Sequence, residues 1–140
     1  MHARVYRTAA LQDIAGSTAT AVAFDAEEYD VGTLHDNAVN PSRLTVPVGG
    51  DGLWLIIGQL SWVADANGLR QAWIYKNGSR VAIDEVPPDA TLPISNQVAC
   101  LQEAVAGDYF ELYARQTGAA TLGVIGGALD LASFSAAKLF

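Results

Sequence analysis

Few side chains in this sequence could carry acid–base or nucleophilic chemistry. There are two histidines, His2 and His35, and one cysteine, Cys100. A Ser-His-Asp triad needs a nucleophile on a strained turn beside a positioned base, and the sequence has no Gly-x-Ser-x-Gly motif. A reactive thiol needs an activating base, and neither histidine is close to Cys100 in sequence. We therefore expect no catalytic residues and interpret Cys100 as a small buried hydrophobe.

Acidic residues crowd one segment of the chain. They are Asp25, Glu27, Glu28 and Asp30, with Asp36 and Asp51 expected near its end. Oxygen ligands in a loop suit calcium, but this spacing matches no twelve-residue calcium loop, and the histidines and cysteine are too few for a zinc site. A solvated acidic rim is the favoured interpretation and a calcium site the alternative. The glycine-rich segment 121–127 lacks Gly-x-Gly-x-x-Gly, so no nucleotide site is indicated. We predict no bound metal and no cofactor.

Trp73 and Tyr75 share one face of a predicted strand, with Gln71 and Asn77 beside them. If these four residues are exposed, they offer a sugar-stacking surface. The favoured alternative is that the two aromatic side chains pack in an interface or under a loop.

The composition favours one oligomeric domain over residues 1–140. Charged residues make up 16% of the 140 residues, below the roughly 25% of an average soluble domain, and this indicates additional buried surface such as a subunit interface. The net charge of −7 argues against nucleic acid as a partner, because phosphate binding needs a basic face. No signal peptide and no apolar run of about 20 residues is present, so we expect no membrane insertion.

Short alternating segments separated by turn residues predict an all-β sandwich. Strands are expected over 17–24, 43–48, 53–63, 69–76, 79–84, 92–101, 109–116, 121–129 and 134–140. Asn67-Gly68 and Asn77-Gly78 are hairpin signals and predict a three-stranded meander. Residues 3–9 are expected to form an edge strand; a docking arm is the alternative, because Arg4 and Arg7 contrast with the acidic body.

The segment 53–63 is the strongest predicted strand. Trp54, Ile56, Leu60 and Trp62 alternate onto one face, which we assign to the core. The other face begins with Leu53, Leu55 and Ile57, so it also needs a cover, and a neighbouring subunit is the simplest one. We expect a subunit interface formed by five residues: Leu53, Leu55, Ile57, Tyr109 and Tyr113.

The order of several motifs resembles the jelly-roll family of tumour necrosis factor and the complement globular head. The matching stretches are Phe24-Asp25, Tyr29-Asp30, Leu44-Thr45-Val46-Pro47 before glycines and Leu53-Trp54, Ile74 to Gly78, Leu101, Gly107 to Leu112, and Ser133-Phe134-Ser135 before Leu139. The resemblance covers roughly residues 18–140. It implies a jelly roll of about eight to ten antiparallel strands, assembled as a compact homotrimer in which each protomer's aromatic-rich sheet packs around a threefold axis. No collagen-like repeat precedes the domain, and Leu53-Trp54 replaces the family's usual tyrosine.

The stalkless form looks more like versions found in bacterial viruses. We therefore expect a bacteriophage virion structural protein and not an enzyme. It would decorate the capsid or form a fibre head, assemble in the bacterial host cytoplasm, and contact itself and a major capsid, fibre or tail protein. The alternative is a receptor- or glycan-binding module at a virion or cell surface.

Overall fold

The computed structural model describes all 140 residues and contains twelve β-strands without a helix. The strands are β1 (His2–Tyr6), β2 (Leu11–Ile14), β3 (Thr20–Ala21), β4 (Ala26–Val31), β5 (Arg43–Thr45), β6 (Gly52–Trp62), β7 (Arg70–Lys76), β8 (Ser79–Val86), β9 (Ile94–Ala104), β10 (Tyr109–Gln116), β11 (Leu122–Ile125) and β12 (Ser133–Lys138). The expected all-β sandwich is confirmed, with short strands such as β2 and β3 raising the number above eight to ten.

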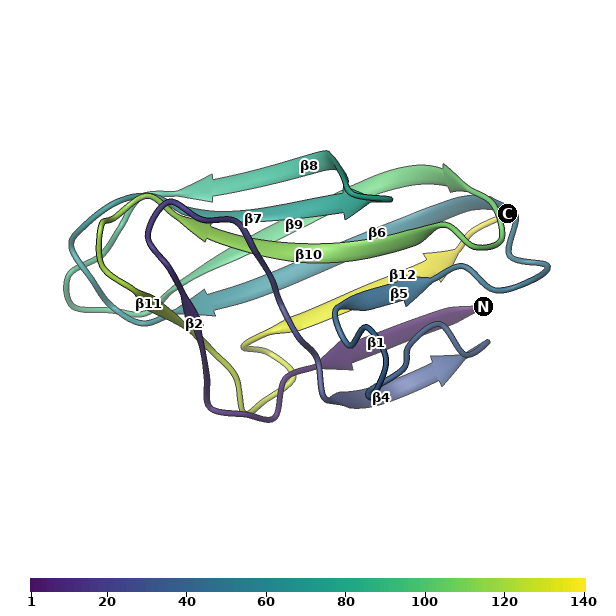
Figure 1. Cartoon of the computed structure of the whole chain (residues 1–140), viewed down its shortest axis with the longest axis horizontal. Helices are drawn as coiled ribbons and strands as arrows, with labels where there is room; N and C mark the ends of the chain where they lie inside the picture. Colours follow the sequence, from purple (N-terminus) through teal and green to yellow (C-terminus); the bar gives the residue numbers. More distant parts are fainter.

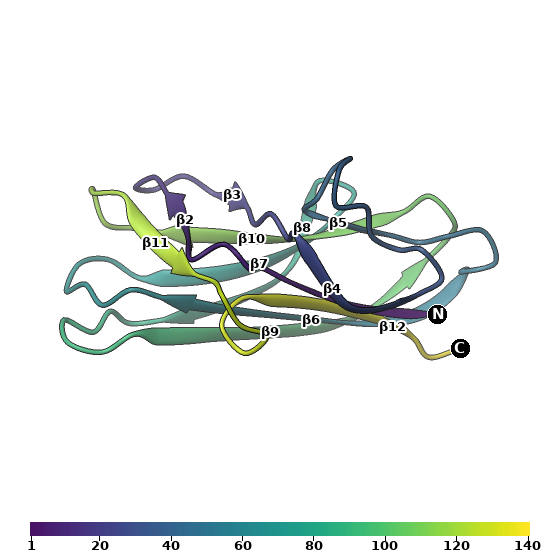
Figure 2. The ribbon, with the colours of Figure 1, turned by 90° about the horizontal axis from the view of Figure 1, so that it is seen from below.

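The strands form two antiparallel sheets, which Figure 2 shows edge-on. Sheet A has the order β2-β11-β6-β12-β1-β4, and β9 pairs with the other side of β6. Sheet B has the order β3-β10-β7-β8, and β5 also pairs with β10. Both chain termini lie at the same end of the sandwich (Figure 1).

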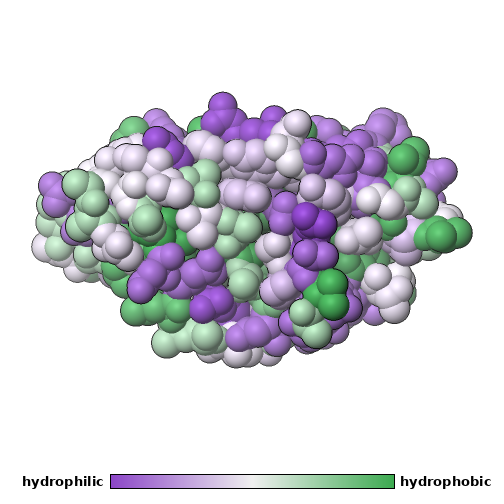
Figure 3. Space-filling model, viewed as in Figure 1, coloured by the Kyte–Doolittle hydropathy of each residue, from purple (hydrophilic) through white to green (hydrophobic).

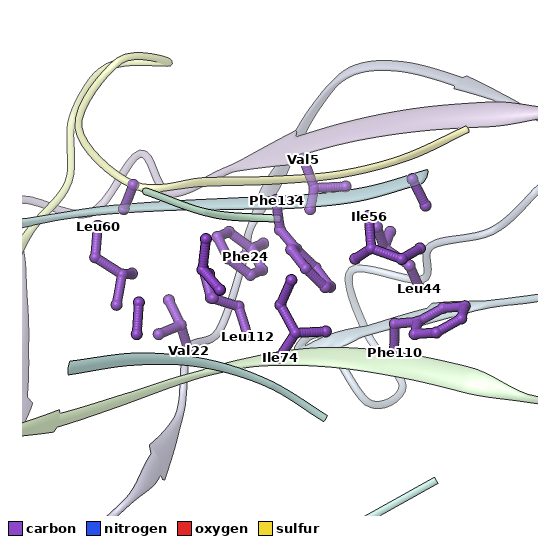
Figure 4. Close-up of a cluster of buried hydrophobic side chains, with 14 of the residues drawn as sticks. Val5, Val22, Phe24, Leu44, Ile56, Leu60, Ile74, Phe110, Leu112 and Phe134 are labelled. Carbon is purple, nitrogen blue, oxygen red and sulfur yellow. The ribbon is translucent and has the colours of Figure 1, made fainter. Parts of the chain in front are cut away.

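The core between the sheets follows the predicted alternation of β6. Trp54, Ile56, Leu60 and Trp62 are fully buried. Figure 4 shows apolar side chains from both sheets meeting in this layer. The Phe24 and Phe134 rings stack there with their centroids 6.1 Å apart. The alternation predicts which side chains of β6 are buried, because successive side chains of a strand point to opposite faces of the sheet.

Two predictions about strand neighbours are wrong. Residues 3–9 do not form an edge strand or an arm, because β1 pairs with β12 on one side and β4 on the other. Asn67-Gly68 does not close a hairpin, because β6 belongs to sheet A and β7 to sheet B. Asn77-Gly78 does close the β7–β8 hairpin, with φ values of 50° and 78°.

Arg70 braces the loop in which the chain passes from one sheet to the other after β6. Its fully buried guanidinium donates to the carbonyl oxygens of Asp65, Asn67 and Gly68 at 2.6–3.0 Å. These bonds hold the connecting loop against the start of β7. A two-residue Asn-Gly signal cannot reveal such a contact, because it depends on a side chain outside the turn.

Candidate functional site

The outward face of sheet A carries a small apolar surface at its centre. Leu55 and Ile57 on β6 point away from the core, as predicted, and Ile57 is 42% exposed. Leu101 on β9 lies opposite Leu55 and is 54% exposed. Ala137 on β12 is the partner of Leu55 on its other side. Three adjacent strands therefore contribute to one surface, which we call the sheet A patch: Leu55, Ile57, Ala99, Leu101, Ser135 and Ala137.

The patch continues across β1 to β4. Arg4 lies between Ser135 and Tyr29 in the register, and it forms an ion pair with Glu28 at 3.1 Å. The His2 ring meets the Tyr29 ring edge-on at 5.4 Å. A shallow depression of about 400 Å³ spans this region, from His2 and Tyr29 to Leu55 and Ile57. The charged groups thus lie to one side of the apolar centre.

The five predicted interface residues do not form one surface of the protomer. Leu53, Leu55 and Ile57 lie on β6 in sheet A, whereas Tyr109 and Tyr113 lie on β10 in sheet B. Leu53 and Leu55 are half-buried and Ile57 is exposed. The grouping fails because Tyr109 and Tyr113 face outward from the second sheet, on the opposite side of the sandwich. The two-residue period predicts on which face of its own strand a side chain lies. It does not predict to which sheet each strand belongs.

Sheet B exposes an aromatic row on its outward face. Trp73 and Tyr75 of β7 share this face as predicted, with ring centroids 6.1 Å apart. The Tyr113 ring of β10 lies 4.3 Å from the Tyr75 ring. All three side chains are half-buried. Burial and the neighbouring Glu111 carboxylate raise the pKa of the Tyr113 hydroxyl.

Arginine side chains cover much of this row. The Arg80 guanidinium lies over the Trp73 ring at 4.6 Å, and that of Arg115 lies 5.6 Å from the same ring. Arg43 lies over the Tyr109 ring at 3.9 Å. We call this surface the sheet B patch: Arg43, Trp73, Tyr75, Arg80, Tyr109, Tyr113 and Arg115. Figure 3 shows one whole face of the molecule, on which green hydrophobic residues are scattered among purple hydrophilic ones.

The two predicted amide residues of the ligand surface have structural partners. The buried Gln71 side chain accepts a hydrogen bond from Arg115 Nη1 at 2.9 Å and donates to Glu85. Asn77 donates to Asp108 at 2.7 Å and accepts from the Tyr109 backbone N–H at 2.9 Å. Asn77 therefore links the β7–β8 turn to the turn before β10, at one end of the aromatic row. Gln71 orients Arg115 at the other end.

The remaining reactive residues do not form a catalytic constellation. His35 is buried with Nδ1 3.0 Å from Glu27 Oε1 and Nε2 3.0 Å from the Pro41 carbonyl oxygen, so it closes the loop before β5. Cys100 is half-buried and points inward, and burial raises the pKa of its thiol. A raised pKa leaves less thiolate for nucleophilic attack.

The acidic segment does not gather around a common point. Asp25 accepts hydrogen bonds from Thr8, Asp30 from Leu34 and His35, Asp36 from Ala38 and Val39, and Asp51 from Ala106. These bonds brace separate loops. No three His, Cys, Asp or Glu side chains come together in a manner suited to a metal ion. The chain also contains no helix suited to crossing a membrane.

Solved structures with the same arrangement of strands identify the fold. Murine APRIL at pH 5.0 superposes with a TM-score of 0.73 at 12% identity, covering 99% of this chain and 98% of that chain. The globular domain of zebrafish complement 1qA gives 0.68 at 10% identity, covering 99% and 97%. Murine APRIL at pH 8.0 gives 0.67 at 15% identity, covering 99% and 100%.

The fold is a jelly roll of the tumour necrosis factor type. The resemblance inferred from the motif order is thus confirmed for the fold of the tumour necrosis factor and complement heads. No protein-family model and no curated protein matches the sequence. At 10–15% identity these similarities establish the architecture of the jelly roll alone.

Sequence reasoning missed several members of both surfaces. Leu101 belongs to the sheet A patch, and Arg80 and Arg115 belong to the sheet B patch. Leu101 alternates with the inward-pointing Cys100, so its outward direction was available from the period of two. Nothing local indicated that β9 would pair with β6, because the partners Leu55 and Leu101 are 46 positions apart in the sequence, and Leu53 and Glu103 are 50 positions apart.

Proposed function

We propose that this protein is a non-enzymatic structural module that self-associates as a homotrimer through the outward face of sheet A. The observation that carries the proposal is the sheet A patch, in which exposed Leu101 and Ile57 flank Leu55 across β6 and β9. Exposed apolar groups that adjoin one another are a common mark of protein association. The homotrimer implied by the family resemblance supports self-association, and the choice of sheet A rests on the sheet A patch alone.

Burial of the patch would contribute substantially to assembly. Fully burying a Leu or Ile side chain stabilises by roughly 1.5 to 3 kcal/mol, and part-exposed side chains contribute a fraction of that. Leu55, Ile57 and Leu101 from each of three protomers would add such contributions. Ordering and association costs oppose them, so the trimer requires the patch to pack closely.

Sedimentation velocity at micromolar concentration tests the oligomeric state. A trimer of the 14.7 kDa chain is expected. Sedimentation as a monomer at that concentration would contradict self-association through this face.

For the biological setting we propose a bacteriophage virion, with the trimer decorating the capsid or forming a fibre head. Its partners would be a major capsid protein or a fibre or tail protein. The order of the family-like motifs along the chain and the apolar residues on both faces of β6 support this setting. Quantitative mass spectrometry of purified particles is expected to find the chain at a copy number divisible by three. Particles that lack the chain would contradict the proposal.

A glycan-binding module is the second candidate, favoured by the aromatic row on sheet B. Trp73, Tyr75 and Tyr113 form a connected set of rings on the sheet that the proposed trimer leaves free. Glycan-array binding is expected to fall when Trp73 is replaced by Ala. Tyr29→Ala is the matched control, because it removes an exposed aromatic side chain from sheet A. Equal binding by wild type and Trp73→Ala would remove this candidate.

A further inference from the structure

The sheet B patch concentrates positive charge on an acidic protein. The chain has six arginines and a net charge of −7. Three of the six, Arg43, Arg80 and Arg115, lie against the rings of one sheet face. This local excess of cations is the opposite of what the overall composition predicts, and it points to a ligand of opposite charge.

Two of these arginines have no carboxylate partner. Arg43 lies 3.5 Å from Glu111, whereas Arg80 and Arg115 form no ion pair. Arg115 donates one hydrogen bond, to Gln71, and Arg80 donates none. The indole Nε1 of Trp73 is buried and also lacks an acceptor. Unpaired donors therefore surround the Trp73 ring.

The guanidinium groups also decide what kind of sugar the patch can take. A neutral sugar stacks on a bare aromatic face, but Arg80 and Arg115 already lie over the Trp73 ring. A planar guanidinium held on a ring presents its N–H groups to a carboxylate, which it binds through two parallel hydrogen bonds. The Trp73 ring thus positions the two guanidinium groups, and these groups would contact the ligand.

The carboxylates at the margin of the patch favour a sparsely charged ligand over a nucleic acid. Glu85 is exposed beside Gln71, and Glu111 lies between Tyr109 and Tyr113 on β10. Both would repel a polymer with one charge on every residue. Glu85 can accept hydrogen bonds from sugar hydroxyls, and the Tyr75 and Tyr113 hydroxyls can donate to ring or linkage oxygens.

We propose that the outward face of sheet B binds a carboxylated saccharide, with Arg80 and Arg115 holding the carboxylate beside Trp73. The inference rests on the second proposed function and adds the class of glycan and the residues that select it. Because sheet A would form the trimer interface, each trimer would present three such sites.

Titration calorimetry with sialyllactose and lactose tests the inference, because the two sugars differ in one carboxylated residue. Wild type is expected to bind sialyllactose at least about tenfold more tightly than lactose, as expected for a charge-assisted hydrogen bond. Arg80→Gln and Arg115→Gln are each expected to remove most of that preference. Lys138→Gln is the matched control, since it removes one positive charge from sheet A.

The possible results distinguish failure of this inference from failure of the proposals on which it rests. Equal binding of the two sugars would overturn the carboxylate assignment and leave glycan binding in place. No binding of sialyllactose, together with no binding of any other glycan on an array, would overturn both. Tighter binding of single-stranded DNA than of sialyllactose would overturn the saccharide class. Sedimentation of the same samples reports on the trimer separately, because all three substitutions lie outside the sheet A patch.

Discussion

Leu55 of β6 lies directly opposite Leu101 of β9 in the antiparallel register, and both side chains point away from the core. Neighbouring side chains of this kind stabilise a sheet by covering one another, but here they also leave an apolar surface in contact with water. The sandwich core is complete without them, because Trp54, Ile56 and Leu60 fill the inner face of the same strand. A second chain packed on this face, as in the proposed trimer, would remove them from water.

Replacing Ile57 with Asp is expected to dissociate the proposed trimer. Ile57 adjoins the Leu55–Leu101 pair and is 42% exposed, so the protomer tolerates a charge there while an apolar interface does not. Sedimentation velocity measures the change. The matched control is Ile83→Asp, which alters a similarly exposed Ile (48%) in sheet B. A trimer that survives Ile57→Asp would show that this face is not the interface.

Asp108 is expected to make stability fall in acid. Hydrogen bonds from Asn77 and from the Val105 N–H, followed by Lys76 at 3.0 Å, lower its pKa from 3.8 to about 2. The ionised form is favoured by folding, so this contribution is complete above about pH 4 and is lost as the pH falls through about 2.

The measurement is urea unfolding of wild type and Asp108→Asn between pH 2 and pH 6. The free-energy difference between them is expected to be largest at pH 6 and to shrink towards pH 2. Asp13→Asn serves as the control, because Asp13 is exposed on β2 and makes no side-chain hydrogen bond. A difference that does not vary with pH would contradict the assignment of the acid-sensitive contribution to Asp108.

Asn96 joins the two sheets through a buried polar network. Its Oδ1 accepts from Trp62 Nε1 at 2.8 Å, and its Nδ2 donates to Asp84 at 2.7 Å and to the Arg70 carbonyl oxygen at 3.2 Å. Asn96→Ala would leave the indole N–H and a carboxylate oxygen without partners. We expect a loss of at least about 2 kcal/mol in the free energy of unfolding.

Chemical denaturation with a tryptophan-fluorescence readout checks this value, because Trp62 is one of the network's members. Gln97→Ala provides the comparison on the same strand, since Gln97 is exposed and makes no hydrogen bond through its side chain. Similar midpoints for the two variants would mean that the network adds nothing beyond the surrounding packing.

Gly58 leaves room for Leu112 across the sandwich. A methyl group at Gly58 would lie 2.5 Å from Leu112 Cδ1 and 3.2 Å from Val98 Cγ1, and both neighbours are buried. Gly58→Ala is therefore expected to destabilise the fold by roughly 1 to 3 kcal/mol through overpacking. The thermal unfolding midpoint reports this loss.

Gly123→Ala is the control for that substitution. Its added methyl group would meet the tip of Leu11 at 3.0 Å, and Leu11 is 50% exposed and can turn into solvent. An equal fall in the unfolding midpoint for both variants would mean that loss of glycine matters more than the contact with Leu112.

Several parts of the fold could be read from the residues themselves. The core face of β6, the Asn77-Gly78 hairpin and the strand character of 92–101 are local properties, because the two-residue period and the turn conformation depend on adjacent residues. The outward direction of Leu55 and Ile57 followed from the same period. So did the shared face of Trp73 and Tyr75 on β7.

Only the tertiary structure decided which strands are neighbours. It placed β6 and β7 in different sheets, with Arg70 bracing the 65–68 loop between them. It also placed β1 between β12 and β4, and put Tyr109 and Tyr113 on the sheet opposite Leu55. It also brought Arg80 and Arg115 over the Trp73 ring. Pairing between strands far apart in the chain depends on how the whole set of apolar faces is buried together. The alternation along one strand therefore determined to which face each side chain points. Packing between strands determined which side chains come together to form a surface.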